Sequence, residues 1–249
     1  MFPAGEASLI RGVIFDLNGT LIDIATDEWS DDVYRVTANF LRYCQVNISP
    51  ETLKERYFAL NREQRRRSRE EFPEFDAVKI FQTVIDEFRI PGSSHVEYSH
   101  AYSAAQVFRA AGLRKLELYS GVREVLDSLK HRYHLGAVSD GQSAWAVPEL
   151  LAAGLGGYFS PVVVSGDHGF RKPDDRMFSL ALEAMQLPAS EVVMVGNDMY
   201  RDVYGGHGAG MKTVFFRSNQ GDWEFREVEA DYIIYDFREL PEALAFLEN

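Results

Sequence analysis

Short apolar segments that alternate with longer helical ones are the feature that most restricts the fold of this 249-residue chain. Each apolar segment is rich in β-branched residues and ends at glycine or at a polar turn. A strand that is apolar throughout belongs to a sheet covered on both faces, which is the usual state of a parallel sheet. We therefore predict an α/β fold with a doubly wound parallel sheet. Its strands are expected at Gly12 to Asp16, Leu135 to Ser139, Val162 to Ser165, Val192 to Gly196, Lys212 to Phe216 and Tyr232 to Tyr235.

The stretch between the first two predicted strands is too long for one crossover helix. From about Ile24 to Tyr119, apolar residues recur at helical spacing without a convincing strand, and Pro50 after Ser49 marks one helix start. We predict a small helical domain of residues 24–119, inserted into an α/β core of residues 1–23 and 120–249. The core is expected to contain helices at Val122 to His131, Asp174 to Met185 and Pro241 to Leu247.

Charge and composition narrow the class of protein. The net charge of −12 argues against nucleic acid as a partner, because binding to phosphates needs a basic face. The basic run at Arg65, Arg66 and Arg67 is followed by two glutamates and is interpreted as a solvated helix face. We find no apolar segment long enough for a membrane span and only one cysteine, so we expect a cytoplasmic protein without a disulfide or membrane contact.

The segment GVIFDLNGTLID, from Gly12 to Asp23, carries the strongest chemical signal. Its predicted strand delivers Asp16 to the carboxyl end of the sheet, where ligand sites of open α/β sheets lie. Gly19 allows a sharp turn, and Thr20 can donate hydrogen bonds. Taken alone, an aspartate at this place is as often a turn former as a functional group.

Three later segments accompany it in a fixed order. They are LGAVSDGQ, with Ser139 at the end of a predicted strand; GFRKPDDRMF, with Lys172 before a helix; and VVMVGNDMYRDVYGGHGAGM, with an acidic loop after a strand. Together the four segments resemble the four motifs of the haloacid dehalogenase superfamily. The resemblance covers the chain from about Gly12 onward, and the helical insertion lies where this family carries its cap.

The resemblance implies a magnesium-dependent hydrolase that transfers the phosphoryl group of a small phosphorylated metabolite to an aspartate. A monomer or a homodimer is expected. The implied roles are as follows: catalytic, Asp16, Asn18 and Lys172; phosphate-binding, Ser139, Asp140, Gly141 and Lys172; metal-binding, Asp16, Asn18 through its carbonyl, Asn197 and Asp198; supporting, Thr20 and Asp202.

Two positions depart from the family pattern. Asn18 stands where phosphatases of the family carry a second aspartate, and an amide cannot exchange a proton near neutral pH. General acid/base catalysis at this point, typically worth about 10²–10⁴-fold in rate, would be missing. Asn197 replaces the first aspartate of the acidic loop, which should weaken magnesium binding.

Two alternatives therefore remain: a weakly catalytic protein that binds or senses a phosphometabolite, and a 2-haloacid dehalogenase-like hydrolase.

The predicted cap is expected to select the substrate by closing over Asp16. We consider five of its side chains as candidates, without a basis in the sequence for ranking them. They are Trp29, Tyr57, Arg62, Arg66 and Phe75.

Overall fold

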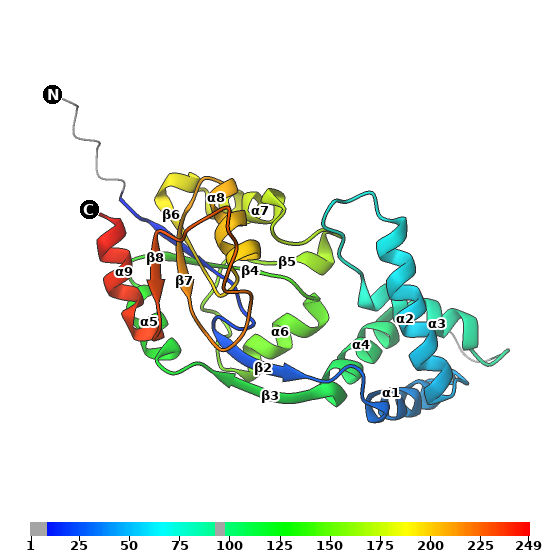
Figure 1. Cartoon of the computed structure of the whole chain (residues 1–249). Coiled ribbons are helices and arrows are strands. Elements are labelled where there is room, and N and C mark those ends of the chain that lie inside the picture. The colour runs from blue at the N-terminus through cyan, green and yellow to red at the C-terminus, as the bar shows by residue number, and fades with distance from the viewer. Residues whose placement is uncertain (1–8, 93–97) are drawn as a thin grey trace.

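The protein is described by a computed structural model, which covers residues 9–92 and 98–249 (Figure 1). Residues 1–8 of the predicted core and residues 93–97 of the predicted helical domain lie outside the described residues. Within the described part, six parallel strands form one sheet. Their order across the sheet is β5 (Val162–Val164), β4 (His134–Ser139), β1 (Gly12–Phe15), β6 (Val192–Gly196), β7 (Lys212–Phe216) and β8 (Tyr232–Ile234).

Helices cover both faces of this sheet, so the predicted doubly wound α/β fold is confirmed. Along β1, Val13 and Phe15 point into one apolar cluster and Ile14 into another, as the two-residue period of a strand requires. The first cluster is covered by α5 (Val122–Leu129), α6 (Ser143–Ala152) and α9 (Leu240–Leu247), and the second by α7 (Asp175–Met185) and α8 (Gly205–Gly208). Short helical turns η1 (Ser165–Asp167), η2 (Ala189–Glu191), η3 (Met199–Tyr204) and η4 (Phe237–Glu239) complete this part. Each predicted strand is present with its ends within one residue.

The insertion is helical, and its helices lie beside the sheet (Figure 1). They are α1 (Asp31–Tyr43), α2 (Pro50–Arg67), α3 (Ala77–Phe88) and α4 (Tyr98–Gly112). The predicted start at Pro50 is confirmed, since Ser49 caps α2 by accepting a hydrogen bond from the amide of Thr52. The helices share an apolar core that also takes in Ala144 and Trp145 from α6. None of the helices in residues 9–92 and 98–249 is long and apolar enough to cross a lipid bilayer.

The expectation of no strand between Ile24 and Tyr119 is wrong. Strand β2 (Ile22–Thr26) pairs antiparallel with β3 (Leu113–Leu118), and this ribbon forms both connections between the sheet and the helices. Most ribbon residues are only partly buried, so they lack the continuous apolar character by which the core strands were found.

The carboxyl ends of the parallel strands place polar side chains at one edge of the sheet. Asp16 follows β1, Ser139 ends β4, Ser165 follows β5 and Asn197 follows β6. Because β4, β1 and β6 are neighbours in the sheet, the residues at their ends lie close together in space although they are far apart in sequence.

Candidate active site

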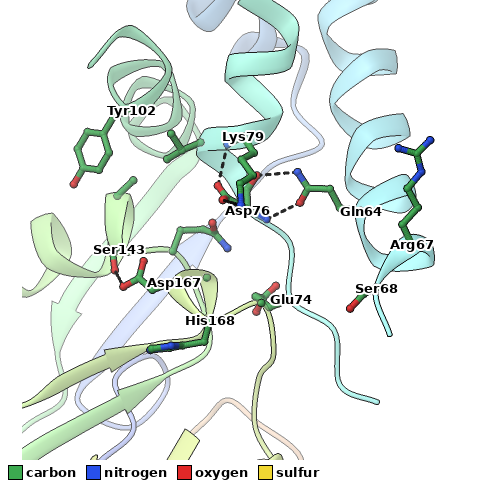
Figure 2. A pocket seen from close by; sticks show the side chains of 15 residues that line it. Gln64, Arg67, Ser68, Glu74, Asp76, Lys79, Tyr102, Ser143, Asp167 and His168 are labelled. Carbon is green, nitrogen blue, oxygen red and sulfur yellow. Dashed lines mark hydrogen bonds and ion pairs between the residues drawn. The ribbon is translucent and has the colours of Figure 1, made fainter. Parts of the chain in front are cut away.

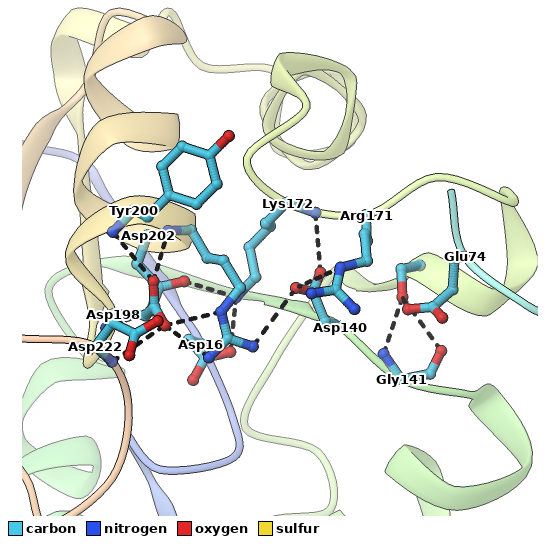
Figure 3. A network of polar contacts seen from close by, with 12 residues as sticks. Asp16, Glu74, Asp140, Gly141, Arg171, Lys172, Asp198, Tyr200, Asp202 and Asp222 are labelled. Carbon is cyan, nitrogen blue, oxygen red and sulfur yellow. Dashed lines mark hydrogen bonds and ion pairs between the residues drawn. The ribbon is translucent and has the colours of Figure 1, made fainter. Parts of the chain in front are cut away.

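Asp16 leaves the buried strand β1 and contacts a lysine from a distant loop (Figure 3). The ammonium Nζ of Lys172 donates hydrogen bonds to Asp16 Oδ1 at 2.7 Å, to Asp202 Oδ1 at 2.7 Å and to the carbonyl oxygen of Val138 at 3.1 Å. The Thr20 hydroxyl donates to Asp16 Oδ2 at 2.9 Å. The structure thus brings together four of the residues for which the family resemblance implies a role.

One ammonium balances two carboxylates in a site that is nearly closed to water. The side chain of Lys172 is 2% exposed and that of Asp202 is 1% exposed. Burial opposes the charged form of Lys172, but Asp16 and Asp202 hold its pKa above the ordinary value of a lysine. Burial raises the pKa of Asp202, against the opposing effect of Lys172. The backbone N–H groups of Asn197 and Asp198 donate to Asp202 Oδ2 at 3.0 and 3.1 Å, which fixes this carboxyl group in place.

The Ser139 hydroxyl lacks a partner in the described part of the protein. Ser139 is buried at the end of β4, and its Oγ makes no hydrogen bond there. The next residue, Asp140, accepts a hydrogen bond from the backbone N–H of Lys172 at 2.9 Å, while the N–H of Gly141 donates to Ser165 Oγ at 2.9 Å. A buried hydroxyl without a partner is costly unless a ligand supplies one. Ser139 is therefore placed to bind an oxygen of a bound molecule.

Asn18 and Gly19 form the turn directly after Asp16. Asn18 lines a cavity that also reaches Ser139. Gly19 has a φ of +89°, and a Cβ added there would lie 2.3 Å from Nδ2 of Asn197. Glycine is required at this position for two reasons. The backbone adopts a left-handed conformation, and Asn197 packs directly against it.

Asn197 and Asp198 are adjacent in sequence but face different partners. Asn197 Oδ1 lies 3.1 Å from Thr20 Oγ1, the same hydroxyl that contacts Asp16 Oδ2. Asp198 caps η3 and accepts hydrogen bonds from Nε and Nη2 of Arg201 at 2.9 and 2.7 Å. Burial opposes the ionisation of Asp198, but these hydrogen bonds keep its pKa below its usual value.

Oxygen donors for a hard cation are therefore present but few. In residues 9–92 and 98–249, no group of three or more His, Cys, Asp or Glu side chains is arranged to hold a metal ion. The oxygens of Asp16 and Asn197 nevertheless converge on one hydroxyl, and amide and carboxylate oxygens are ligands that magnesium accepts. The donor set fits such an ion through these two side chains, and Asp198 can join it only by releasing Arg201.

A cavity of about 240 Å³ opens beside this network and reaches the helical insertion. Asn18, Ser139, Asp140, Gly141, Arg171 and Arg201 line it from the α/β part, and Glu28, Arg65, Glu74, Phe75 and Arg109 from the insertion. Of the five proposed cap candidates, Phe75 lines this cavity, whereas Arg62 and Arg66 are exposed on α2 and do not line it. Trp29 is 70% exposed and stacks on Phe58, whereas Tyr57 is buried in the core of the helices.

Arg65 is a partial exception to the interpretation of the basic run as a solvated face, because its side chain is 40% exposed but one of its nitrogens is buried. It lies two helical turns after the buried Tyr57, on the same side of α2, and its Nε is buried. Its neighbour Arg66 is exposed. The helical spacing from Tyr57 is the sequence signal that could have distinguished the partly buried Arg65 from the exposed Arg66. The roles of Arg109, Arg171 and Arg201 in lining the cavity were also missed, because each is an isolated arginine in the sequence.

A larger cavity of about 640 Å³ lies nearby, between α2, α3 and the loop around His168 (Figure 2). Gln64, Lys79 and Asp167 are among the residues that line it, but neither Asp16 nor Lys172 does. Its polar groups are largely engaged with each other; for example, Gln64 bonds to the backbone of Asp76. Asp16 and Lys172 do not line the smaller cavity directly either, but Asn18, Ser139 and Arg201 do, and these residues adjoin the network around Asp16. We therefore place the candidate active site at the smaller cavity.

Comparisons with known proteins agree with this geometry. A family model described as haloacid dehalogenase-like hydrolase matches residues 10–210. Glyceraldehyde 3-phosphate phosphatase of Pyrococcus furiosus is 34% identical over 160 residues, which is 62% of this chain and 65% of that protein, so the chain spans just under two thirds of this relative. Phosphoglycolate phosphatase of Agrobacterium fabrum is 27% identical over 241 residues, covering 93% of this chain and 91% of that protein. The crystal structure of a 2-haloacid dehalogenase from Pseudomonas syringae superposes with a TM-score of 0.67 at 24% identity, covering 96% of this chain and 99% of that one.

Proposed function

The chain belongs to the haloacid dehalogenase-like hydrolases, and from this we propose that it is a magnesium-dependent phosphatase for a small phosphorylated metabolite, with Asp16 as the nucleophile. The observation that carries the proposal is the hydrogen bond of 2.7 Å between Lys172 Nζ and Asp16 Oδ1, beside a buried Ser139 hydroxyl without a protein partner. A carboxylate in contact with an ammonium, and a free donor on the adjoining cavity, are the groups that phosphoryl transfer needs.

The reaction follows from these positions. A carboxylate oxygen of Asp16 attacks phosphorus while the bond from phosphorus to the ester oxygen breaks, giving a phosphorylated aspartate and an alcohol. Lys172 orients Asp16 and balances its charge, and the Ser139 hydroxyl donates to a phosphoryl oxygen. Water then attacks phosphorus, releases inorganic phosphate and restores the carboxylate.

Asn18 affects both steps of this reaction. It lines the cavity at the place where the alcohol leaves, but its amide has no proton to give. The leaving oxygen must take its proton from water, and the attacking water must lose its proton to solvent. We therefore expect turnover to be slow compared with a site that has an acid at this position.

Magnesium is part of the proposal. When bound, it would supply positive charge that offsets repulsion between an anionic nucleophile and an anionic phosphate. Asp16, the carbonyl of Asn18 and Asn197 would hold it, and Asp198 is retained as a further candidate ligand. Acidic side chains outnumber basic ones around the site, so a phosphate dianion would be poorly bound without an added cation. The acids are Asp16, Glu28, Glu74, Asp140, Glu149, Asp198 and Asp202, and the bases are Arg65, Arg109, Arg171, Lys172 and Arg201.

We further propose that residues 24–119 act as a cap domain over a catalytic core of residues 1–23 and 120–249. The cavity is lined from both parts, so closure of the helices would shield Asp16 from water. Its volume of about 240 Å³ is below the roughly 300–1,000 Å³ of sites for drug-sized ligands, which favours a small metabolite. The phosphatases named among the relatives act on small phosphate esters, which supports the same size class.

A protein that binds a phosphometabolite with little turnover is the second candidate, and Asn18 is the observation that favours it. An assay of phosphate release from a panel of small phosphate esters, with and without Mg²⁺, distinguishes the two functions. Asp16→Asn should abolish release. Asp175→Asn, the same exchange at an exposed residue of α7, should not.

Release by Asp16→Asn at the wild-type rate, or no release by the wild-type protein from any ester, would exclude the proposed phosphatase. Halide release from 2-chloropropionate is measured in parallel. Halide without phosphate release would assign the protein to the dehalogenases.

A further inference from the structure

The cavity contains a guanidinium that the reaction described above does not use. Arg65 lies in the last turn of α2 and reaches the cavity wall beside Phe75, with its Cζ 5.4 Å from the centre of the Phe75 ring. Its Nε is buried and has no hydrogen-bond partner in the described part of the chain. Arg65 Nη2 forms an ion pair with Glu74 Oε1 at 3.6 Å, a distance that is too long for a hydrogen bond.

Two other arginines of the cavity already donate hydrogen bonds to carboxylates. Arg109 Nε donates to Glu149 at 2.6 Å, and Arg201 Nη2 donates to Asp198 at 2.7 Å. Arg171, next to Lys172 in the chain, lies 4.0 Å from Asp140 and so belongs to the phosphoryl end of the cavity. Arg65 is therefore the guanidinium that the insertion offers to a ligand.

Glu74 does not neutralise Arg65 fully. Its Oε2 accepts a hydrogen bond from Ser165 at 2.9 Å, and its Oε1 accepts one from the N–H of Phe75 at 3.0 Å. Burial raises the pKa of Glu74. Both oxygens of Glu74 are thus engaged with other donors, and its contact with Arg65 is only a 3.6 Å ion pair.

We propose, on the basis of the phosphatase function above, that the substrate is a phosphomonoester bearing a carboxylate, and that Arg65 binds this carboxylate. Nε and Nη2 of a guanidinium form a fork that matches the two oxygens of a carboxylate. Ser139 and Arg65 line the same small cavity, so a compact molecule can contact Ser139 through its phosphate and Arg65 through its carboxylate. Arg65 is thus a specificity-determining residue and takes no part in the bond-breaking steps.

Binding is measured in the Asp16→Asn background, which does not depend on turnover. Calorimetry with Mg²⁺ compares 2-phosphoglycolate with ethyl phosphate, which has the same phosphate ester but lacks the carboxylate. We expect 2-phosphoglycolate to bind about tenfold or more tightly. Arg65→Gln should reduce this ratio to about threefold or less, and Arg65→Lys, which keeps the charge but loses the fork, should give an intermediate ratio.

Arg66→Gln is the matched control, because it removes the same charge from the next, exposed residue of α2. It should leave the ratio unchanged. Equal affinity for the two ligands, no binding of 2-phosphoglycolate, or a ratio that survives Arg65→Gln would overturn the inference while the phosphatase proposal stands. Failure of the phosphatase proposal is detected separately, as absence of phosphate release by the protein with Asp16 intact.

Discussion

Replacing Lys172 by methionine tests how the site is held together. The ammonium of Lys172 is buried and lies 2.7 Å from one oxygen each of Asp16 and Asp202. Methionine keeps most of the volume but leaves both carboxylates without a cation. Breaking a buried ion pair by removing one partner costs about 3–5 kcal/mol. For a chain of this size, that loss lowers the melting temperature by about 6–20 °C, taking roughly 2–4 °C per kcal/mol.

The loss should also depend on pH. Without Lys172, burial raises the folded-state pKa of Asp202 further above its unfolded value of about 3.9. A group with a raised pKa contributes stability that is fully present below the unfolded pKa and is lost as the pH rises through the folded pKa. The difference between Lys172→Met and the wild type should therefore be smaller at pH 5 than at pH 8.

Thermal unfolding followed by circular dichroism measures both effects. Lys130→Met, which removes the same side chain from an exposed pair with Asp127, serves as the control and should melt like the wild type. A Lys172→Met protein that melts within about 2 °C of the wild type at pH 8, or one that is equally destabilised at both pH values, would refute this account of the buried network.

Further substitutions test separate parts of the site. Asn18→Asp should raise kcat for p-nitrophenyl phosphate by about 10²–10⁴-fold, measured against Asn18→Ala, because it restores a group that exchanges protons. Asn197→Asp should lower the Mg²⁺ dissociation constant in a calorimetric titration, because it adds a negative charge to a side chain that we propose as a magnesium ligand. Gly19→Ala should destabilise the fold by about 1–3 kcal/mol in urea unfolding and reduce phosphate release, because φ is +89° and the new methyl group would displace Asn197. Trp145→Ala should lower the urea midpoint by an amount equivalent to about 3–5 kcal/mol, because its ring joins α6 to the core of the insertion.

The core of the fold could be predicted from the sequence because its strands are buried on both faces. Such strands are apolar along their whole length, and β1 and β6 stand out for this reason. The β2–β3 ribbon could not be found in the same way. Its residues are mostly half-buried, and its two short strands pair although they lie at opposite ends of the insertion in the sequence. Pairing at that distance leaves no local pattern in the sequence.

The candidate site could be predicted only where a residue lies at a strand end or in a recognisable motif. Asp16, Ser139 and Lys172 meet that condition, and the structure places them around one cavity or one network. Arg65 does not, because its proximity to Phe75 depends on how α2 packs against α3 and the segment before it. The pairing of Asp198 with Arg201 was likewise beyond prediction, because an acidic residue after a strand can face a metal or cap the next helix with equal ease.

The central claim, that Asp16 takes up the phosphoryl group, is tested most directly by trapping the intermediate. The protein is mixed with a ³²P-labelled phosphomonoester and Mg²⁺, quenched in acid within milliseconds and digested, and the labelled peptide is identified by mass spectrometry. Our account predicts an acid-stable, alkali-labile label on the peptide that contains Asp16, and no label in Asp16→Asn. A label on another residue, or the same label in Asp16→Asn, would contradict it.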